Sequence, residues 1–188
     1  AGAPIIWSSQ GLSPPEYYDR AGPVGFEDVV ALYERLSRKA AALLIWTESG
    51  AALLKQAARL EAPIVVLPPV LPARAASIAH TRKHDGKLRL LFVGRDAARK
   101  GLYELVTALE QLGPQLDDCQ IDIVSKPPPD LQARIQTLKN TQLHLNASNQ
   151  DIASLMAEAD ILVLPTLAET FGYVLIEAMA HACALLTV

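Results

Sequence analysis

The chain has 188 residues, of which 51% are hydrophobic and 20% are charged, and its formal net charge at pH 7 is −3. This composition allows a sizeable core, in one large domain or two small ones. The weak negative charge argues against nucleic acid as a main partner. The longest purely apolar runs are far shorter than the roughly 18 residues that a membrane-spanning helix needs.

Two cysteines, Cys119 and Cys183, show neither a CxxC spacing nor a metal-ligand spacing. We therefore expect no disulfide framework and no zinc site, and a reducing compartment such as the cytoplasm. The chain has no initiator Met and stops at ALLTV, an apolar run typical of a core strand. We therefore expect a sequence that is truncated at both ends.

Strands and helices are predicted to alternate over the first seventy or so residues. Apolar and β-branched runs predict strands at 3–9, 42–47 and 62–69. A helix is predicted from an apolar stripe at spacings of three and four, formed by Val29, Leu32, Tyr33, Leu36 and Ala40. A second helix is predicted over 49–60, with Ser49 as its cap.

The alternation continues in the second half of the chain. Strands are predicted at 88–94, 121–125, 142–146, 160–165 and 184–188. The helices between them include one striped by Leu102, Leu105, Leu109 and Leu112 and ended by Gly113, and one that begins near Phe171. Because the strands are continuous apolar runs, we expect an α/β fold with Rossmann-like parallel sheets covered by helices on both faces.

A polar, basic segment from 72 to 87 separates the two halves. Such a change in composition is typical of a domain boundary. We therefore expect two domains, at residues 1–77 and 78–188.

The loop after the strand at 88–94 reads GRDAARKG, from Gly94 to Gly101. Ligands of open parallel sheets bind beyond the carboxyl ends of the strands, so this loop is a candidate site. Arg95, Arg99 and Lys100 precede a predicted helix N-terminus, a combination that favours phosphate. The alternative is a loop whose basic side chains are only solvated.

A second candidate loop, PTLAETFG, follows the strand at 160–165. Glu169 lies before the next predicted helix and Glu177 lies in its second turn, which places the two on the order of 10 Å apart. That separation is loose for a glycosidase pair, which needs roughly 5 to 9.5 Å, and suits two contacts on one elongated ligand. The alternative is a solvated helix face.

The two loops together resemble the donor-binding domain of retaining GT-B glycosyltransferases of family 4, the group 1 glycosyl transferases. The resemblance rests on FVGRDAARKG, followed some seventy residues later by ADILVLPTLAETFGYVLIEAMA, in which two glutamates are separated by seven residues. It covers about residues 86–188. Residues 26–70 match more weakly the last part of that family's acceptor-side domain.

The resemblance implies a role for each matching residue. Arg95 and Lys100, in the loop that starts at Gly94, would bind the diphosphate of a nucleotide sugar and stabilise the leaving group. Glu169 would hydrogen-bond hydroxyls of the donor sugar, and Glu177 would bind the ribose.

The backbone amides around Phe171, Gly172 and Tyr173 would add to phosphate binding at a helix N-terminus. Because cationic side chains serve the diphosphate and no Asp-x-Asp motif is present, the resemblance implies neither a metal nor a cofactor besides the donor substrate.

The chain departs from the family at three places. Ala182 and Ala184 stand where the family usually has Gly and Pro, and VSKPPP stands where it has a Gly-rich turn. Gln10 aligns with a position where many members place a histidine that faces the reacting sugar. We expect Gln10 to supply a hydrogen bond without titrating, or the activity to be weakened.

The resemblance implies transfer of a sugar from a nucleoside-diphosphate sugar to a saccharide, lipid or other small acceptor, with retention of configuration. Peripheral contact with the inner face of the membrane is compatible with a lipid acceptor. The alternatives are a non-catalytic nucleotide-binding α/β module and a related GT-B enzyme such as a nucleotide-sugar epimerase. We expect the isolated 188-residue chain to bind donor weakly and to transfer nothing.

Overall fold

The computed structural model describes residues 6–9, 11, 13, 15, 24–68, 70, 85–167, 169 and 171–187. The chain divides into two compact units, Ala1–Val70 and Leu71–Val188. The boundary that we expect between residues 77 and 78 lies outside the described residues, as do Gln10 and the basic segment up to residue 84.

The first unit contains a parallel sheet with the strand order β1-β2-β3. Helices α2 and α3 follow β1 and β2 in the chain, as parallel pairing requires of a crossover. Leu43 and Ile45 of β2 are fully buried in its core. The elements are β1 (Ile6–Ser9), α2 (Phe26–Ser37), β2 (Ala42–Ile45), α3 (Glu48–Ala57) and β3 (Ile64–Val66).

Two details of this unit differ from the sequence predictions. The cap of α3 is Thr47, whose hydroxyl accepts a hydrogen bond from the Gly50 amide at 3.0 Å, rather than Ser49, which lies inside the helix. In α2 the buried face includes Val30 and Tyr33, whereas Leu32 is 38% exposed. The inward face of α2 is therefore rotated from the predicted stripe.

The second unit contains a parallel sheet with the strand order β6-β5-β4-β7-β8. The central β4 therefore has β5 on one side and β7 on the other. The strands are β4 (Leu88–Val93), β5 (Cys119–Val124), β6 (Thr141–His144), β7 (Ile161–Leu164) and β8 (Ala184–Thr187). The helices are α4 (Leu102–Leu112), the short 3₁₀ turn Gly113–Leu116, α5 (Pro129–Thr137), α6 (Asn149–Glu158) and α7 (Tyr173–Ala180).

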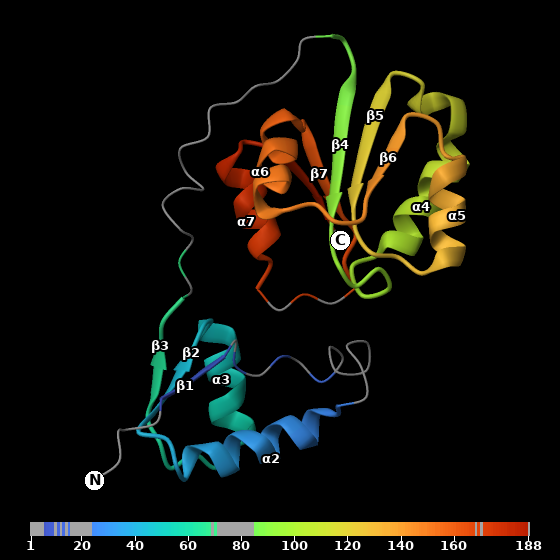
Figure 1. Cartoon of the computed structure of the whole chain (residues 1–188). Helices are drawn as coiled ribbons and strands as arrows, with labels where there is room; N and C mark the ends of the chain where they lie inside the picture. The colour runs from blue at the N-terminus through green and yellow to red at the C-terminus, as the bar shows by residue number, and fades with distance from the viewer. Residues whose placement is uncertain are drawn as a thin grey trace. The chain divides into compact units, whose positions relative to one another are not determined.

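Helices cover both faces of this sheet, with α4 and α5 on one side and α6 and α7 on the other (Figure 1). Phe92 of β4 belongs to the core on the α4 side, and its neighbour Leu91 belongs to the core on the α6 side. The predicted parallel α/β architecture with two helical layers is thus confirmed.

The strand order places a topological switch point beside β4. The chain leaves β4 toward β5 through α4, and it later reaches β7, on the other side of β4, through α6. Because all these strands are parallel, the loops after β4 and β7 emerge next to each other at the carboxyl edge. The two candidate loops are therefore neighbours.

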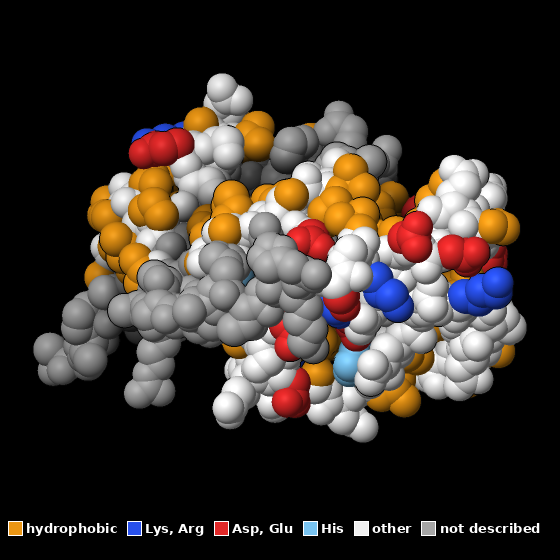
Figure 2. All heavy atoms as spheres, turned by 90° about the horizontal axis from the view of Figure 1, so that it is seen from above, with side chains coloured by type: hydrophobic (Ala, Val, Ile, Leu, Met, Phe, Trp, Pro, Cys, Tyr) orange, Lys and Arg blue, Asp and Glu red, His pale blue; other side chains and the backbone are white. Residues whose placement is uncertain are grey.

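On the face seen in Figure 2, acidic and basic side chains are interspersed in small groups among apolar ones, and the described residues form no continuous basic patch there. Within the described parts of the chain, no helix is both long and apolar enough to cross a bilayer.

Candidate functional site at the carboxyl edge of the second sheet

The loop after β4 forms a compact turn that its own acidic residue stabilises. The Gly94 amide extends the pairing with β5 by donating to the Val124 carbonyl at 3.0 Å. Asp96 then accepts from the Arg99 amide at 3.2 Å and from Arg99 Nε at 3.3 Å. Its carbonyl accepts from the Lys100 amide at 2.9 Å. These contacts fix the backbone that carries Lys100.

Gly94 lies against the stem of Lys100. A Cβ added at Gly94 would lie 2.9 Å from the Cβ of Lys100, closer than Cβ atoms approach other atoms in proteins, and 3.1 Å from Phe92 Cζ, which is an unusually tight contact. The loop therefore needs glycine at this position, because any side chain would displace the lysine or the core phenylalanine beneath it.

The loop after β7 contacts the Lys100 turn directly. The Arg99 carbonyl accepts two hydrogen bonds from this loop, one from the Leu167 amide at 2.9 Å and one from the Thr166 hydroxyl at 3.2 Å. Gly101 begins α4 in the left-handed region, with φ of +74°. A Cβ there would lie 1.8 Å from the Pro165 carbonyl oxygen, so the two backbones touch.

The same loops are joined by an ion pair between Lys100 Nζ and Glu169 Oε2. The two side chains are only 13% and 22% exposed. Partial burial screens the pair less than bulk water would, and each charge offsets the cost of desolvating the other. Two of the predicted site residues, 69 positions apart in the chain, therefore meet.

Helix α7 begins at Gly172, which is its N-cap and has φ of +78°. The helix starts at Tyr173, slightly after the predicted start near Phe171. A Cβ at Gly172 would lie 3.5 Å from Glu169 Cγ, so Glu169 lies next to the start of the helix. The rings of Phe171 and Tyr173 also contact each other, with centroids 5.0 Å apart and planes tilted by 55°. The first amides of any helix have no partner within the helix, so this end can bind an anion.

Glu177 is half-buried within α7. Burial raises the pKa of its carboxyl group above the usual 4.5, and the nearby His181 opposes that shift. His181 is only 3% exposed, and its Nδ1 donates to the Glu177 carbonyl at 2.8 Å, because a carbonyl oxygen can only accept. Its other ring nitrogen, Nε2, has no hydrogen-bond partner among the described residues.

The structure thus places Gly94, Lys100, Glu169 and Gly172 close together at one edge of the sheet. Arg95 is exposed in the same loop. The separation of about 10 Å between Glu169 and Glu177 stays a prediction that follows from helix rise. Among the described residues, no group of three His, Cys, Asp or Glu side chains could hold a metal ion.

Sequence reasoning did not identify Thr166 and the Arg99 carbonyl as groups that join the two loops. The available signal was a hydroxyl residue placed directly after a buried strand that ends in proline. That signal is weak, because threonine is also common in ordinary turns. The contact between the loops depends on the strand order, which sequence periodicity does not determine.

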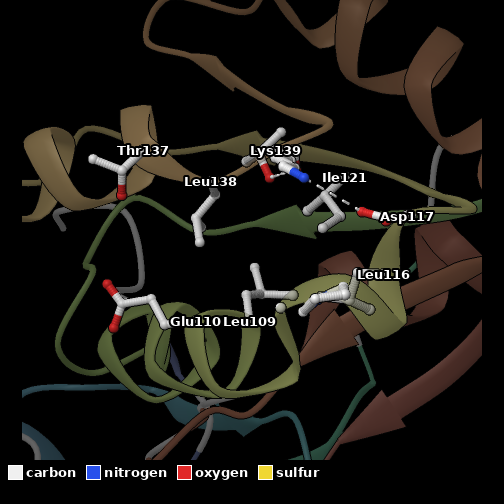
Figure 3. Close-up of a pocket in the computed structure, with 11 residues that line it drawn as sticks. Leu109, Glu110, Leu116, Asp117, Ile121, Thr137, Leu138 and Lys139 are labelled. Carbon is white, nitrogen blue, oxygen red and sulfur yellow. Dashed lines mark hydrogen bonds and ion pairs between the residues drawn. The ribbon is translucent and has the colours of Figure 1, made fainter.

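A pocket of about 290 Å³ lies at the other end of the sheet, near the amino ends of β5 and β6. Figure 3 shows Leu109, Leu116 and Leu138 around its interior, with the ion pair of Lys139 and Asp117 on one side. It is lined by no predicted site residue. The candidate site is therefore defined by the two loops rather than by this cavity.

Comparison with protein families gives one match over more than half of the chain. Residues 87–188 match the family model described as "Glycosyl transferases group 1". The matched segment begins just before β4 and includes both candidate loops and α7.

A curated relative matches over a longer part of the chain. The chain is 30% identical over 157 residues to "Alpha-D-kanosaminyltransferase" of Streptomyces kanamyceticus, which covers 76% of this chain and 41% of that protein. The chain therefore spans less than half the length of this curated relative.

Solved structures are similar to nearly the whole chain. The pneumococcal O-GlcNAc transferase GtfA, in complex with UDP and GlcNAc, matches with a TM-score of 0.70 at 18% identity, over 98% of this chain and 37% of its own. WaaG, a glycosyltransferase involved in lipopolysaccharide biosynthesis, matches with a TM-score of 0.73 at 22% identity, over 97% of this chain and 55% of its own. At these identities the structural matches establish the fold.

Proposed function

Because this chain belongs to the group 1 glycosyl transferases and has a GT-B type of fold, we propose that it binds a nucleoside-diphosphate sugar and serves the transfer of that sugar to an acceptor. In this reaction the bond between the anomeric carbon and the β-phosphate oxygen breaks, and a bond to an acceptor oxygen forms. The acceptor gives up a proton and the nucleoside diphosphate leaves. The proposal includes retention of the anomeric configuration.

The observation that carries the proposal is the pairing of Lys100 with Glu169 across the two loops at the carboxyl edge. A partly buried ammonium beside a helix N-terminus suits a diphosphate, and a carboxylate next to it suits sugar hydroxyls. The two chemical groups that a sugar diphosphate presents are thus matched by two side chains already in contact.

The proposed roles follow the charges of the side chains. Lys100 and the exposed Arg95 bind the diphosphate, and their positive charge stabilises the negative charge that develops on the leaving phosphate. Amides at Phe171, Gly172 and Tyr173 contribute at the start of α7. Gly94 leaves room for the Lys100 stem.

Donor binding requires the Lys100–Glu169 pair to rearrange. Without donor, each side chain neutralises the other. A diphosphate would take over the ammonium, and Glu169 would turn to the sugar hydroxyls. Glu177, further along α7, would accept hydrogen bonds from the ribose.

We propose a saccharide, lipid or other small acceptor, and a cytoplasmic location, where nucleotide sugars are available. Cationic side chains and helix amides serve the diphosphate, so the proposal includes no metal and no cofactor besides the donor.

The first test is binding of bare UDP, GDP and ADP to the chain, measured by thermal shift and titration calorimetry. For the nucleotide that binds, Glu177→Ala is expected to weaken affinity by about tenfold or more, since it removes a charged hydrogen-bond acceptor. Glu169→Ala is expected not to weaken it, because the substitution releases Lys100 from its partner.

Sugar transfer by the full-length protein is the second readout. Glu169→Ala is expected to lower transfer strongly while bare nucleotide still binds. Glu110→Ala, an exposed glutamate at the far end of α4, is the matched control and should change neither property. Equal loss of nucleotide binding in the Glu169 and Glu177 variants would contradict the roles, and so would retained transfer in Glu169→Ala. A full-length protein that binds the nucleotide but transfers no sugar would favour a nucleotide-binding module instead.

A further inference from the structure

Two hydrogen bonds between the loops after β4 and β7 share one acceptor, the Arg99 carbonyl oxygen. It accepts from the Leu167 amide at 2.9 Å and from the Thr166 hydroxyl at 3.2 Å. Both donors come from the loop after β7, whereas the acceptor belongs to the residue immediately before Lys100. We call these two hydrogen bonds the Arg99 clamp.

The residue immediately after Lys100 is held as well. Gly101 packs so closely against the Pro165 carbonyl that a Cβ would lie 1.8 Å from that oxygen. The backbone of Lys100 is therefore fixed to the β7 loop on both sides, through Arg99 and through Gly101.

The side chain of Lys100 has little freedom in this setting. Its stem lies against Gly94, and its ammonium pairs with Glu169, which belongs to the same segment as Thr166. A shift of the Arg99 carbonyl away from Thr166 would therefore move the ammonium relative to Glu169 and to the start of α7.

We propose that Thr166 is a positioning residue, whose hydroxyl sets the place of the Lys100 ammonium by holding the Arg99 carbonyl. This inference rests on the proposed function, because the property that it tunes is nucleotide-diphosphate binding by Lys100. Thr166 acts through the carbonyl of Arg99, the residue before Lys100, and not through a contact with the donor. The Leu167 amide also donates to the Arg99 carbonyl, so we expect the fold to survive removal of the hydroxyl.

The test compares Thr166→Val, which keeps the shape and removes the hydroxyl, with Thr166→Ser, which keeps the hydroxyl. Thr137→Val is the matched control, since it removes a hydroxyl that donates to the Arg134 carbonyl at 2.7 Å at the end of α5. The probe is whichever of UDP, GDP and ADP binds the parent chain, with Kd measured by titration calorimetry.

We expect Thr166→Val to raise Kd about tenfold, an effect typical of coupled neighbours. Thr166→Ser should restore Kd to within about threefold, and Thr137→Val should leave it unchanged. The two valine variants should lower Tm by similar small amounts, about 4 °C or less. A merely structural role would change Tm without the difference in Kd.

A double-mutant cycle with Lys100→Gln identifies the path of the effect. If Thr166 acts through Lys100, Thr166→Val has no further effect on Kd in the Lys100→Gln background. Independent, multiplicative losses would overturn the inference.

Amide hydrogen exchange, measured without nucleotide, tests the positioning role of Thr166 separately from the proposed function. Amide hydrogen exchange at Leu167 should be faster in Thr166→Val than in the parent, because the clamp has lost one of its two bonds. A parent chain that binds none of the three nucleotides contradicts the proposed function and the positioning role with it. A parent that binds, together with an unchanged Kd or unchanged Leu167 exchange in Thr166→Val, contradicts the inference alone.

Discussion

Ala182 adopts a backbone conformation that suits glycine better than alanine. Its φ of +46° lies in the left-handed region, where the Cβ of an L-residue meets the following carbonyl oxygen. The residue forms the turn between α7 and β8, and its amide donates to the Met179 carbonyl at 2.9 Å. The turn thus keeps a glycine-type geometry although the chain has alanine there.

Ala182→Gly is therefore expected to stabilise the second unit. Relief of the left-handed alanine contributes about 1–2 kcal/mol, and the greater freedom of glycine in the unfolded chain takes back about 0.5–1 kcal/mol. We expect a net gain of up to about 1.5 kcal/mol in the free energy of unfolding, measured by urea denaturation. Ala184→Gly, two residues later in β8, is the control and should be destabilising.

For single residues, the sequence indicates which side chains belong to the candidate site better than it indicates which of them contact each other. The basic loop and the two glutamates were recognisable, because their order and spacing together resemble the donor-binding domain of a known family. That Lys100 meets Glu169 was not deducible, since the pair depends on β7 lying beside β4. The left-handed turn at Ala182 leaves no signal in an alanine.

At the scale of elements, the start of α4 depends on Gly101, its N-cap residue. Gly101 and Gly86 have nearly the same φ, +74° and +79°, but very different surroundings. A Cβ at Gly101 would overlap the Pro165 carbonyl, whereas one at Gly86 would meet nothing within 4 Å. The two glycines therefore separate the effect of backbone conformation from the effect of space.

Gly86→Ala should lower the free energy of unfolding by up to about 1.5 kcal/mol, because the cost of a left-handed alanine is partly offset by the smaller freedom of alanine in the unfolded chain. Gly101→Ala should cost more, about 3 kcal/mol or above, because overpacking adds to the same term. Urea denaturation of the two variants gives the comparison. Similar losses in both would mean that the β7 loop moves aside freely, which would also weaken the case for the Arg99 clamp.

The elements of the second unit followed closely from its sequence. Continuous apolar runs located β4 and β7, and the leucine stripe ended by Gly113 located α4, because both patterns reflect burial directly. The α3 cap was harder to place, since Thr47 and Ser49 can both cap and only the backbone shows which one does. The α2 face was also harder, because its stripe includes an exposed leucine.

At the scale of the whole unit, the sheet is a middle layer between two helical layers. Leu91 and Phe92 are successive residues of β4, each 1% exposed, and they point into different cores. A sheet with one solvated face would alternate buried and exposed residues instead.

Leu91→Ala should therefore lower the free energy of unfolding by about 2–5 kcal/mol and Phe92→Ala by about 3–5 kcal/mol. Leu88→Ala, at the exposed start of the same strand, should cost less than about 1 kcal/mol. Chemical denaturation measures all three. A large loss at only one of the two central positions would contradict the three-layer arrangement.

The layered fold was predictable because strands buried on both faces are apolar throughout. The strand order was not fixed by those patterns, since they do not say on which side of β4 the strand β7 pairs. For the same reasons, the position of the candidate site at the carboxyl edge was predictable, whereas the contacts between the loops after β4 and β7 were not.

The two cysteines of the chain lie in opposite layers around the same sheet. Cys119 belongs to the core beneath α4 and α5, where burial raises the pKa of its thiol. Cys183 belongs to the core beneath α6 and α7, where its thiol donates to the Met156 carbonyl at 3.1 Å. A thiol-modifying reagent can reach either sulfur only after the layer above it opens. Labelling rates at the two cysteines would therefore time the opening of each helical layer separately, without any probe having to be engineered.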